Sequence, residues 1–338
     1  MLLEQKPDSA HKLDKPTLIV ENLTTQFPVR GGVITPVREV SFSVMPGQVM
    51  GLVGESGSGK SMTGYSIMGL LDPPGRVVGG KVLFKNMDLR SLTAAQMRQV
   101  RGDRIAMIFQ DPMMTLNPVL RIDTQIMEAV QAHHRVDRKT ARAMAREALM
   151  QVGISSPDER LLAYPHQFSG GMRQRVAIAI ALINKPDLII CDEPTTALDV
   201  TIQGQILFEM QKLCRQSGTA LIWITHDLSI VAGLADTVCV MYGGQIVESG
   251  TVQQVLAQPR HPYTFGLIAS APSRNVRGAP LHQIEGSAPS LSALPSGCAF
   301  RDRCQRSSEI CKSPPPLEIM EGQTFRCFHP ILADGLGV

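Results

Sequence analysis

The sequence predicts an α/β fold in which a mainly parallel sheet is covered by helices. Three observations support this class. A glycine-rich loop separates an apolar run at 49–53 from a helix-compatible stretch at 62–70. Apolar strand-like runs at 188–191 and 220–225 alternate with helical segments, as in parallel sheets. A hydrophobic content of 43% and a charged content of 19% over 338 residues are typical of a globular chain.

The N-terminal part predicts antiparallel strands. Residues 1–16 read as a polar leader, without the apolar centre of a signal peptide. Alternating apolar residues begin near 18–20 and return at 37–44, with Arg30-Gly31-Gly32 as a turn between them. A further β stretch at 81–84 follows a proline-rich turn. We therefore expect an antiparallel subdomain beside the glycine-rich loop.

The middle of the chain predicts helices and then more strands. The polar, helix-prone segment 122–152 indicates a helical subdomain, which we bound at about 111–170. A helix is expected at 172–183. The runs 237–241 and 245–247 flank Tyr242-Gly243-Gly244, which reads as a hairpin turn. Regular periodicity fades after residue 258, so we divide the chain into 17–258 and 259–338.

The run Gly54-Glu55-Ser56-Gly57-Ser58-Gly59-Lys60-Ser61 fits the phosphate-loop pattern and lies in the strand–loop–helix context that this motif needs. Its backbone N–H groups and the start of the following helix can surround phosphates. Lys60 would reach the β- and γ-phosphates, and the Ser61 hydroxyl would ligate Mg²⁺. The backbone of the loop would bind the nucleotide at Gly54, Ser56, Gly57 and Gly59.

Two further motifs carry chemistry. The apolar run at 188–191 ends in Asp192 and Glu193, where Asp192 suits Mg²⁺ and Glu193 suits a general base that polarises water. Ser169-Gly170-Gly171 opens a helix and predicts a second anion site. The alternative for Ser169 is a simple helix cap, although capping would not need the two glycines.

Composition excludes other classes of protein. A net charge of +3 is too small to argue for nucleic-acid binding. No apolar run approaches the roughly 18 residues of a membrane span, so we expect a cytoplasmic protein. Seven cysteines in such a chain argue against a disulfide framework. Four of them crowd into the tail, where their spacing alone leaves zinc, an iron–sulfur cluster and uncommitted thiols open.

Taken together and in this order, the motifs resemble the ATP-binding subunit of an ABC transporter. The phosphate loop matches Walker A, and Asp192-Glu193 matches Walker B with the catalytic glutamate. The resemblance gives the remaining site residues their roles: the Q-loop residue, a further Mg²⁺ ligand, is Gln110; the signature is Ser169, Gly170 and Gly171; the D-loop residue is Asp199; the switch histidine is His226; and the adenine-stacking aromatic is Phe27.

The segments 111–118 and 261–264, with the tail, resemble the dipeptide/oligopeptide importer branch of that family. The fold thus implied is an ABC-type phosphate-loop ATPase with an antiparallel β subdomain, a helical subdomain and a small irregular C-terminal metal-binding domain. In that branch the tail binds a [4Fe–4S] cluster, here through Cys298, Cys304, Cys311 and Cys327. The implied cofactors are ATP, Mg²⁺ and this cluster.

The resemblance also implies partners and a place of work. A second ATPase subunit, homologous or identical, would pair head to tail with this chain, and two transmembrane permease subunits and an extracytoplasmic binding protein would complete a peptide importer. The chain would lie peripherally on the cytoplasmic face of the inner membrane. Nickel and glutathione are alternative cargoes. A soluble ABC ATPase acting on DNA or ribosomes is disfavoured, because this chain lacks fused units and long coiled coils, and Glu193 with His226 disfavours a module without turnover.

Overall fold

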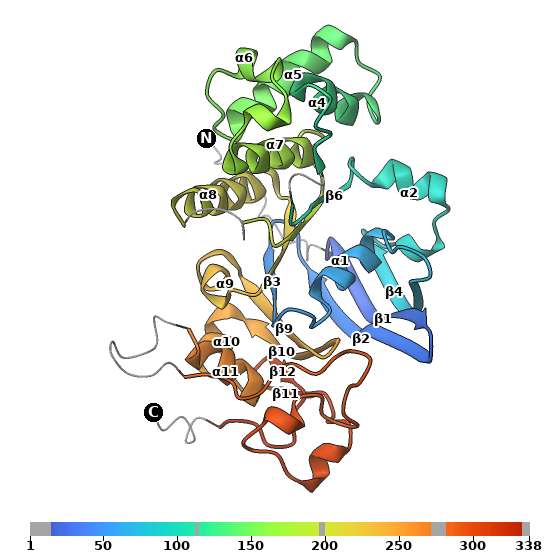
Figure 1. Ribbon diagram of the computed structural model, residues 1–338, viewed down its shortest axis with the longest axis vertical. Coiled ribbons are helices and arrows are strands. Elements are labelled where there is room, and N and C mark those ends of the chain that lie inside the picture. The colour runs from blue at the N-terminus through green and yellow to red at the C-terminus, as the bar shows by residue number, and fades with distance from the viewer. Residues whose placement is uncertain (1–14, 112–114, 196–199, 272–281, 333–338) are drawn as a thin grey trace, which may run out of the picture.

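The computed structural model describes residues 15–111, 115–195, 200–271 and 282–332. Figure 1 shows three regions: a blue antiparallel sheet, a green group of helices, and a central sheet that continues into the orange C-terminal part. The strands are β1 Leu18–Val29, β2 Gly32–Val44, β3 Val49–Val53, β4 Arg76–Phe84, β5 Met87–Asp88, β6 Ile105–Ile108, β7 Leu188–Asp192, β8 Ala220–Thr225, β9 Thr237–Tyr242, β10 Gln245–Thr251, β11 Glu318–Met320 and β12 Gln323–Phe325.

The helices between residues 122 and 182 form the green region of Figure 1. The α-helices are α1 Lys60–Met68, α2 Ala94–Val100, α4 Ile122–Gln131, α5 Arg138–Gln151, α6 Pro157–Leu161, α7 Gly170–Leu182, α8 Val200–Ser217, α9 Leu228–Leu234, α10 Val252–Ala257 and α11 Pro262–Ala269. Short 3₁₀ turns are η1 Leu89–Ser91, η2 Pro165–Gln167, η4 Arg301–Arg303 and η5 Glu309–Lys312.

The main sheet has eight strands in the order β11-β12-β10-β9-β3-β8-β7-β6. The strands β9, β3, β8, β7 and β6 run parallel to one another, which confirms the predicted parallel sheet. All five residues of β3 and of β7 are buried, as expected for strands covered on both faces. The loops that follow β3 and β7 therefore leave the sheet at one edge.

The second sheet confirms the predicted antiparallel subdomain. Its order is β2-β1-β4-β5, and β1 pairs with β2 around the turn at Gly31, whose φ is +93°. The hairpin of β9 and β10 is likewise present. The helix-prone segment 122–152 forms two helices, α4 and α5, because the chain leaves the helical path after residue 131 and restarts at the N-cap Asp137.

The C-terminal segment differs from the expected separate, irregular domain. Its strand β12 pairs antiparallel with β10, so the main sheet continues past residue 259. Phe300 packs in the same apolar cluster as Tyr242 of β9 and Tyr263 of α11. The tail thus packs against the hydrophobic core of the preceding region, which explains why it shows little apolar periodicity of its own.

We expect the substitution Phe300→Ala to destabilise the whole described fold by about 3–5 kcal/mol, because it leaves a cavity among Tyr242 and Tyr263. Denaturant unfolding measures this loss of stability. The fluorescence of Trp223, the single tryptophan, which is buried in β8, reports the transition. Ile319→Ala in β11, where the residue is 73% exposed, is the control and should shift stability by less than about 0.5 kcal/mol. An unchanged Trp223 transition in Phe300→Ala would show an independent tail.

Candidate functional site

The phosphate loop connects the end of β3 to the start of α1. Gly59 caps α1 with φ +101°, a left-handed conformation that disfavours other residues. At Gly54 and Gly59 the backbone passes so close to the carbonyl oxygens of Met241 and Pro36 that a Cβ would collide with them. Gly57, by contrast, has open space around it. The glycines thus bring the loop against β9 and β2 and leave its other side open.

Lys60 lies at the base of this loop. Its Nζ donates to the carbonyl oxygens of Gly54 at 2.8 Å and Glu55 at 2.9 Å. Burial lowers the pKa of Lys60, while the charges of Glu193, Asp192 and Glu55 oppose that shift. The loop therefore carries a buried, hydrogen-bonded ammonium group, and burial strengthens its attraction for phosphate.

Ser61 and Asp192 meet although 131 residues separate them. The Ser61 hydroxyl donates to Asp192 Oδ1 at 2.7 Å, and the Tyr65 hydroxyl also interacts with this buried carboxylate. Burial raises the pKa of Asp192, against the hydrogen bonds from Ser61 and Tyr65 that lower it. A serine hydroxyl beside a buried carboxylate is a set of oxygen ligands that suits Mg²⁺.

Glu193 and His226 form the second pair. His226 Nδ1 lies 3.2 Å from Glu193 Oε2, and the Glu193 side chain is only 14% exposed. Glu193 has φ +45°, an uncommon conformation for a residue with a side chain, and its N–H donates to the Ile224 carbonyl at the end of β8. Strained backbone of this kind is concentrated at functional sites. It directs the carboxylate away from the direction that a continuing strand would give it.

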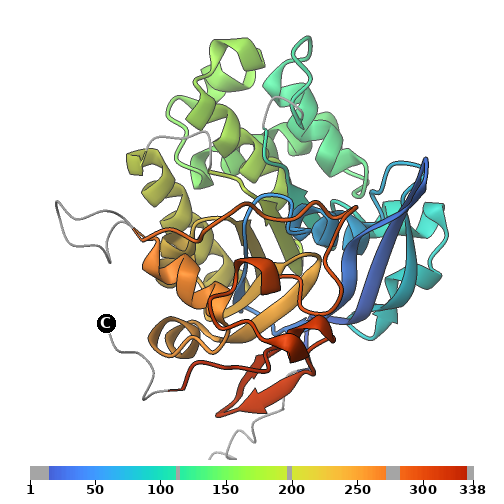
Figure 2. The same cartoon turned by 60° about the horizontal axis from the view of Figure 1, so that its bottom comes forward.

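One pocket collects most of the predicted residues. It is lined by Glu55, Ser56, Gly57, Gly59, Lys60, Ser61, Met62, Gln110, Glu193, His226, Leu267 and Leu291. Gly54 and Asp192 lie just behind it, through their bonds to Lys60 and Ser61. Leu267 and Leu291 come from the C-terminal segment, and sequence reasoning missed them because no motif connects them to the phosphate loop. Figure 2 shows the orange-red segment after residue 281 crossing the front of the molecule.

Several predicted residues do not line this pocket. Ser169, Gly170 and Gly171 begin α7, where the Ser169 side chain accepts a bond from the Met172 N–H at 3.3 Å. Ser169 is therefore a helix cap, yet Gly170 is exposed and would have room for a Cβ, so local packing does not require that glycine. Asp199 lies outside the described residues.

Phe27 is not brought to the pocket. It is half-buried near the end of β1, opposite Ile34 of β2, and its ring covers Gly75 so closely that a Cβ there would collide with it. An adenine-stacking role for Phe27 therefore stays a prediction, since packing on Gly75 already accounts for its position.

The four tail cysteines line a second, small pocket together with His261 and Phe300. Burial raises the pKa of Cys298 and Cys304, and that of Cys327 to about 12. Among the described residues no group of three or more His, Cys, Asp or Glu side chains has the geometry to hold a metal ion. The predicted metal-binding character of the C-terminal region is thus not supported by this arrangement.

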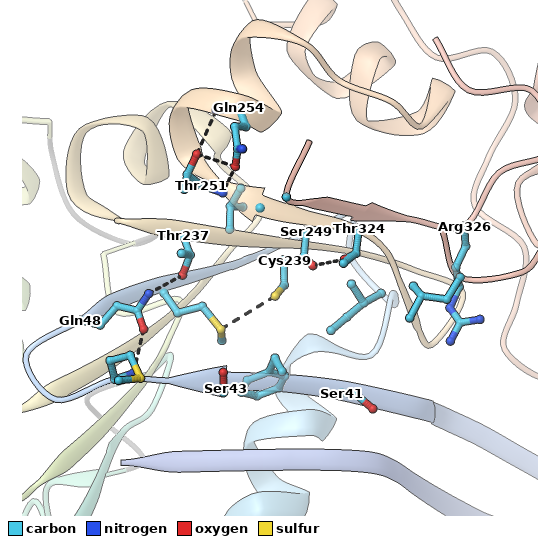
Figure 3. A pocket seen from close by; sticks show the side chains of 18 of the residues that line it. Ser41, Ser43, Gln48, Thr237, Cys239, Ser249, Thr251, Gln254, Thr324 and Arg326 are labelled. Atoms are coloured by element: carbon cyan, nitrogen blue, oxygen red, sulfur yellow. Dashed lines mark hydrogen bonds between the residues drawn. The ribbon is translucent and has the colours of Figure 1, made fainter. Parts of the chain in front are cut away.

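A third pocket lies between β2 and the strands β9, β10 and β12 (Figure 3). Its polar groups pair with each other: Gln48 donates to Thr237, Ser249 lies 2.5 Å from Thr324, and Thr251 donates to Gln254. It lacks the glycine loop and buried lysine of the first pocket, so we assign the nucleotide to the first. No described helix is long and apolar enough to cross a bilayer.

The fold and this site define a phosphate-loop nucleotide-binding protein. Comparison with family models matches residues 37–196 to "ABC transporter" and residues 247–311 to "Oligopeptide/dipeptide transporter, C-terminal region". The chain belongs to the ABC transporter family, in its dipeptide/oligopeptide branch of ATP-binding proteins. The second match spans α11 and the first three tail cysteines, the part of the chain that reaches the nucleotide pocket through Leu267 and Leu291.

Relatives support this assignment along nearly the whole chain. The dipeptide transport ATP-binding protein DppD of Bacillus subtilis is 49% identical over 91% of both chains. The oligopeptide transport ATP-binding protein OppD of Escherichia coli is 44% identical over 93% of both. Among solved structures, a dimeric ATP-binding cassette bound to ADP and phosphate is 26% identical, with a TM-score of 0.63, over 70% of this chain and 98% of that one.

We expect Asp192→Asn to stabilise the protein in the absence of nucleotide and Mg²⁺. The pKa of Asp192 is higher in the folded state than in the unfolded state. Stability therefore falls as the pH rises from the unfolded pKa to the folded pKa, because the folded protein must give up a proton that it binds more tightly. The neutral amide removes this cost, which at a strained active site is on the order of 1 kcal/mol, and keeps an acceptor for Ser61.

Thermal unfolding at a series of pH values upward from 3.8, the ordinary pKa of an aspartate, tests this as the difference in melting temperature between the wild type and the variant. The difference should grow with pH, and added Mg²⁺ and ATP should stabilise the wild type more than the variant. A lower melting temperature for the variant at pH 7 would contradict the assignment of a destabilising buried charge.

Proposed function

We propose that this chain is the ATP-hydrolysing subunit of an importer that takes up peptides of the dipeptide or oligopeptide class. The observation that carries the proposal is the convergence of two polar pairs, Ser61–Asp192 and Glu193–His226, at the mouth of one glycine loop. The relatives named for dipeptide and oligopeptide transport, similar over nine-tenths of the chain, support the cargo class. Nickel and glutathione are the alternative cargoes.

The residues divide the chemistry among them. The loop N–H groups and Lys60 bind the phosphates, and Ser61, Asp192 and Gln110 would hold Mg²⁺, which neutralises phosphate charge. Glu193 orients a water for attack on the γ-phosphate and withdraws its proton. His226, within 3.2 Å of that carboxylate, keeps it directed at the water. Attack in this geometry yields ADP and phosphate.

Glu193→Gln should keep ATP binding and lower turnover by about 10²–10⁴-fold, because the amide cannot take the proton of the attacking water. Steady-state ATP hydrolysis and the affinity for a fluorescent ATP analogue measure the two effects separately. Glu159→Gln, an exposed glutamate on α6, is the control. Near-normal hydrolysis by Glu193→Gln would rule out Glu193 as the base.

ABC cassettes dimerise, and for this chain we propose a composite site. Ser169, Gly170 and Gly171 would contact ATP held by the phosphate loop of a second ATPase subunit, identical or homologous. The support is an exposed second glycine motif, outside the chain's own pocket, at the start of the 13-residue helix α7. Transmembrane permease subunits, with a substrate-binding protein, would place the complex at the cytoplasmic face of the inner membrane.

Mixing a Lys60→Ala chain with a Ser169→Ala chain tests the composite site in a homodimer. Each mixed dimer contains one intact site, so partial activity should return where either variant alone is inactive. With a homologous partner, Ser169→Ala should silence the partner's site. Asp137→Ala removes the N-cap of α5 in the same way and controls for lost helix stability of about 1 kcal/mol. Full activity at the partner's site would refute the trans arrangement.

For the tail we propose that Cys298, Cys304, Cys311 and Cys327 ligate one [4Fe–4S] cluster. The support is four thiols facing one pocket, the ligand set that such a cluster needs. Positive iron would also lower the raised pKa values of these thiols. The role would be structural, or a part in assembly with the partner.

Anaerobically purified protein should contain about four irons per chain and show the brown absorbance of a cluster. Cys304→Ser should lose the iron, whereas Cys214→Ser, a buried cysteine of α8 outside the pocket, should keep it. Stoichiometric zinc without iron would count against the cluster.

A further inference from the structure

Arg303, in the C-terminal segment, forms a salt bridge with Glu55 of the phosphate loop. Arg303 ends the turn η4 and precedes Cys304. Its guanidinium donates to both carboxylate oxygens of Glu55, from Nη1 to Oε2 at 2.7 Å and from Nη2 to Oε1 at 3.1 Å. The Arg303 side chain is only 8% exposed and that of Glu55 is 27% exposed, so the pair is partly shielded from water. Two-pronged pairs of this type fix geometry as well as charge.

Glu55 is the second residue of the phosphate loop and lines the nucleotide pocket. Its backbone N–H donates to the Tyr263 hydroxyl at 2.8 Å, so this N–H is committed to α11. The C-terminal segment thus holds Glu55 by its main chain and by its side chain. A loop position held in both ways cannot turn freely toward or away from the phosphates.

Arg303 is itself firmly oriented. Nη1 donates to the Tyr242 hydroxyl at 3.2 Å, and Nε donates to the Glu285 carbonyl at 2.9 Å. The guanidinium lies 5.9 Å from the centre of the Tyr242 ring and 5.8 Å from that of Phe300. These contacts come from β9 and from the tail, so the cation is preorganised before any ligand binds.

The charge of Glu55 makes this arrangement matter for nucleotide binding. An unpaired carboxylate on the wall of a triphosphate pocket repels the ligand, and over a few ångströms in a partly buried site that repulsion exceeds its value in water several-fold. The Arg303 guanidinium removes this repulsion by pairing with the Glu55 carboxylate. Without Arg303, the groups that bind the phosphates would also have to offset the Glu55 carboxylate.

We propose that Arg303 is a positioning residue for nucleotide binding: it neutralises Glu55 and fixes the first half of the phosphate loop, so that the C-terminal segment sets the affinity of the site for ATP. The inference rests on the proposed ATPase function and adds a determinant that lies about 250 residues beyond the loop itself in the chain. Arg303 touches Glu55 and acts on ATP through it.

The test compares three variants of the full chain in the ATPase assay and in binding of a fluorescent ATP analogue. Arg303→Gln should raise the KM and Kd for ATP by about tenfold, because the unpaired Glu55 carboxylate would repel the phosphates. The kcat should stay near that of the wild type, because Glu193 and His226 are untouched. The double variant Glu55→Gln/Arg303→Gln removes both charges and should recover most of the affinity.

Arg301→Gln is the matched control, since that guanidinium, in the same turn, bonds to Ser296 and Asp302 and to no residue of the nucleotide pocket. Thermal unfolding verifies that each variant folds, and Arg303→Lys, which keeps the charge but not the two-pronged bond, should lie between wild type and Arg303→Gln. An unchanged KM in Arg303→Gln, or a double variant as impaired as the single one, would overturn the proposal. Absence of hydrolysis by the wild type would instead refute the ATPase function.

Discussion

The hydrogen bond from Ser61 to Asp192 is the contact on which the site depends. It joins the helix that follows β3 to the last residue of β7, and β8 lies between those two strands. Because the three strands run parallel, their carboxyl ends meet at one edge, and the loops that follow them face the same space. A strand reversed in the sheet would remove Asp192 and Glu193 from the phosphate loop. The catalytic arrangement therefore depends on the parallel order of these strands.

Buried charge is the cost of this arrangement. Burial disfavours the charged form of both Lys60 and Asp192, and the backbone of Glu193 is held in an uncommon left-handed conformation. A chain selected only for stability would not combine these features at one edge of a sheet. The proposed function accounts for them, because phosphate would pair with the lysine and Mg²⁺ would pair with the aspartate.

The C-terminal segment is part of the site rather than an appendix to it. Its strand β12 extends the main sheet, Phe300 fills a core shared with Tyr242 and Tyr263, and Leu291 lines the nucleotide pocket. Leu291 and Phe300 lie within residues 247–311, which match the family model "Oligopeptide/dipeptide transporter, C-terminal region". A segment with few apolar residues of its own stays ordered because it uses the core and sheet edge of its neighbour.

The sequence by itself determined the elements whose signals are local. The glycine spacing at 54–59, the apolar strand before Asp192 and the two hairpins each depend on neighbouring residues, and the structure has them in place. Only the tertiary structure decided which distant residues meet. Arg303 on Glu55, Leu267 beside the phosphate loop and Phe27 on Gly75 depend on how separate segments pack. Packing of this kind leaves no periodicity or spacing in the chain, because its partners lie up to 248 residues apart.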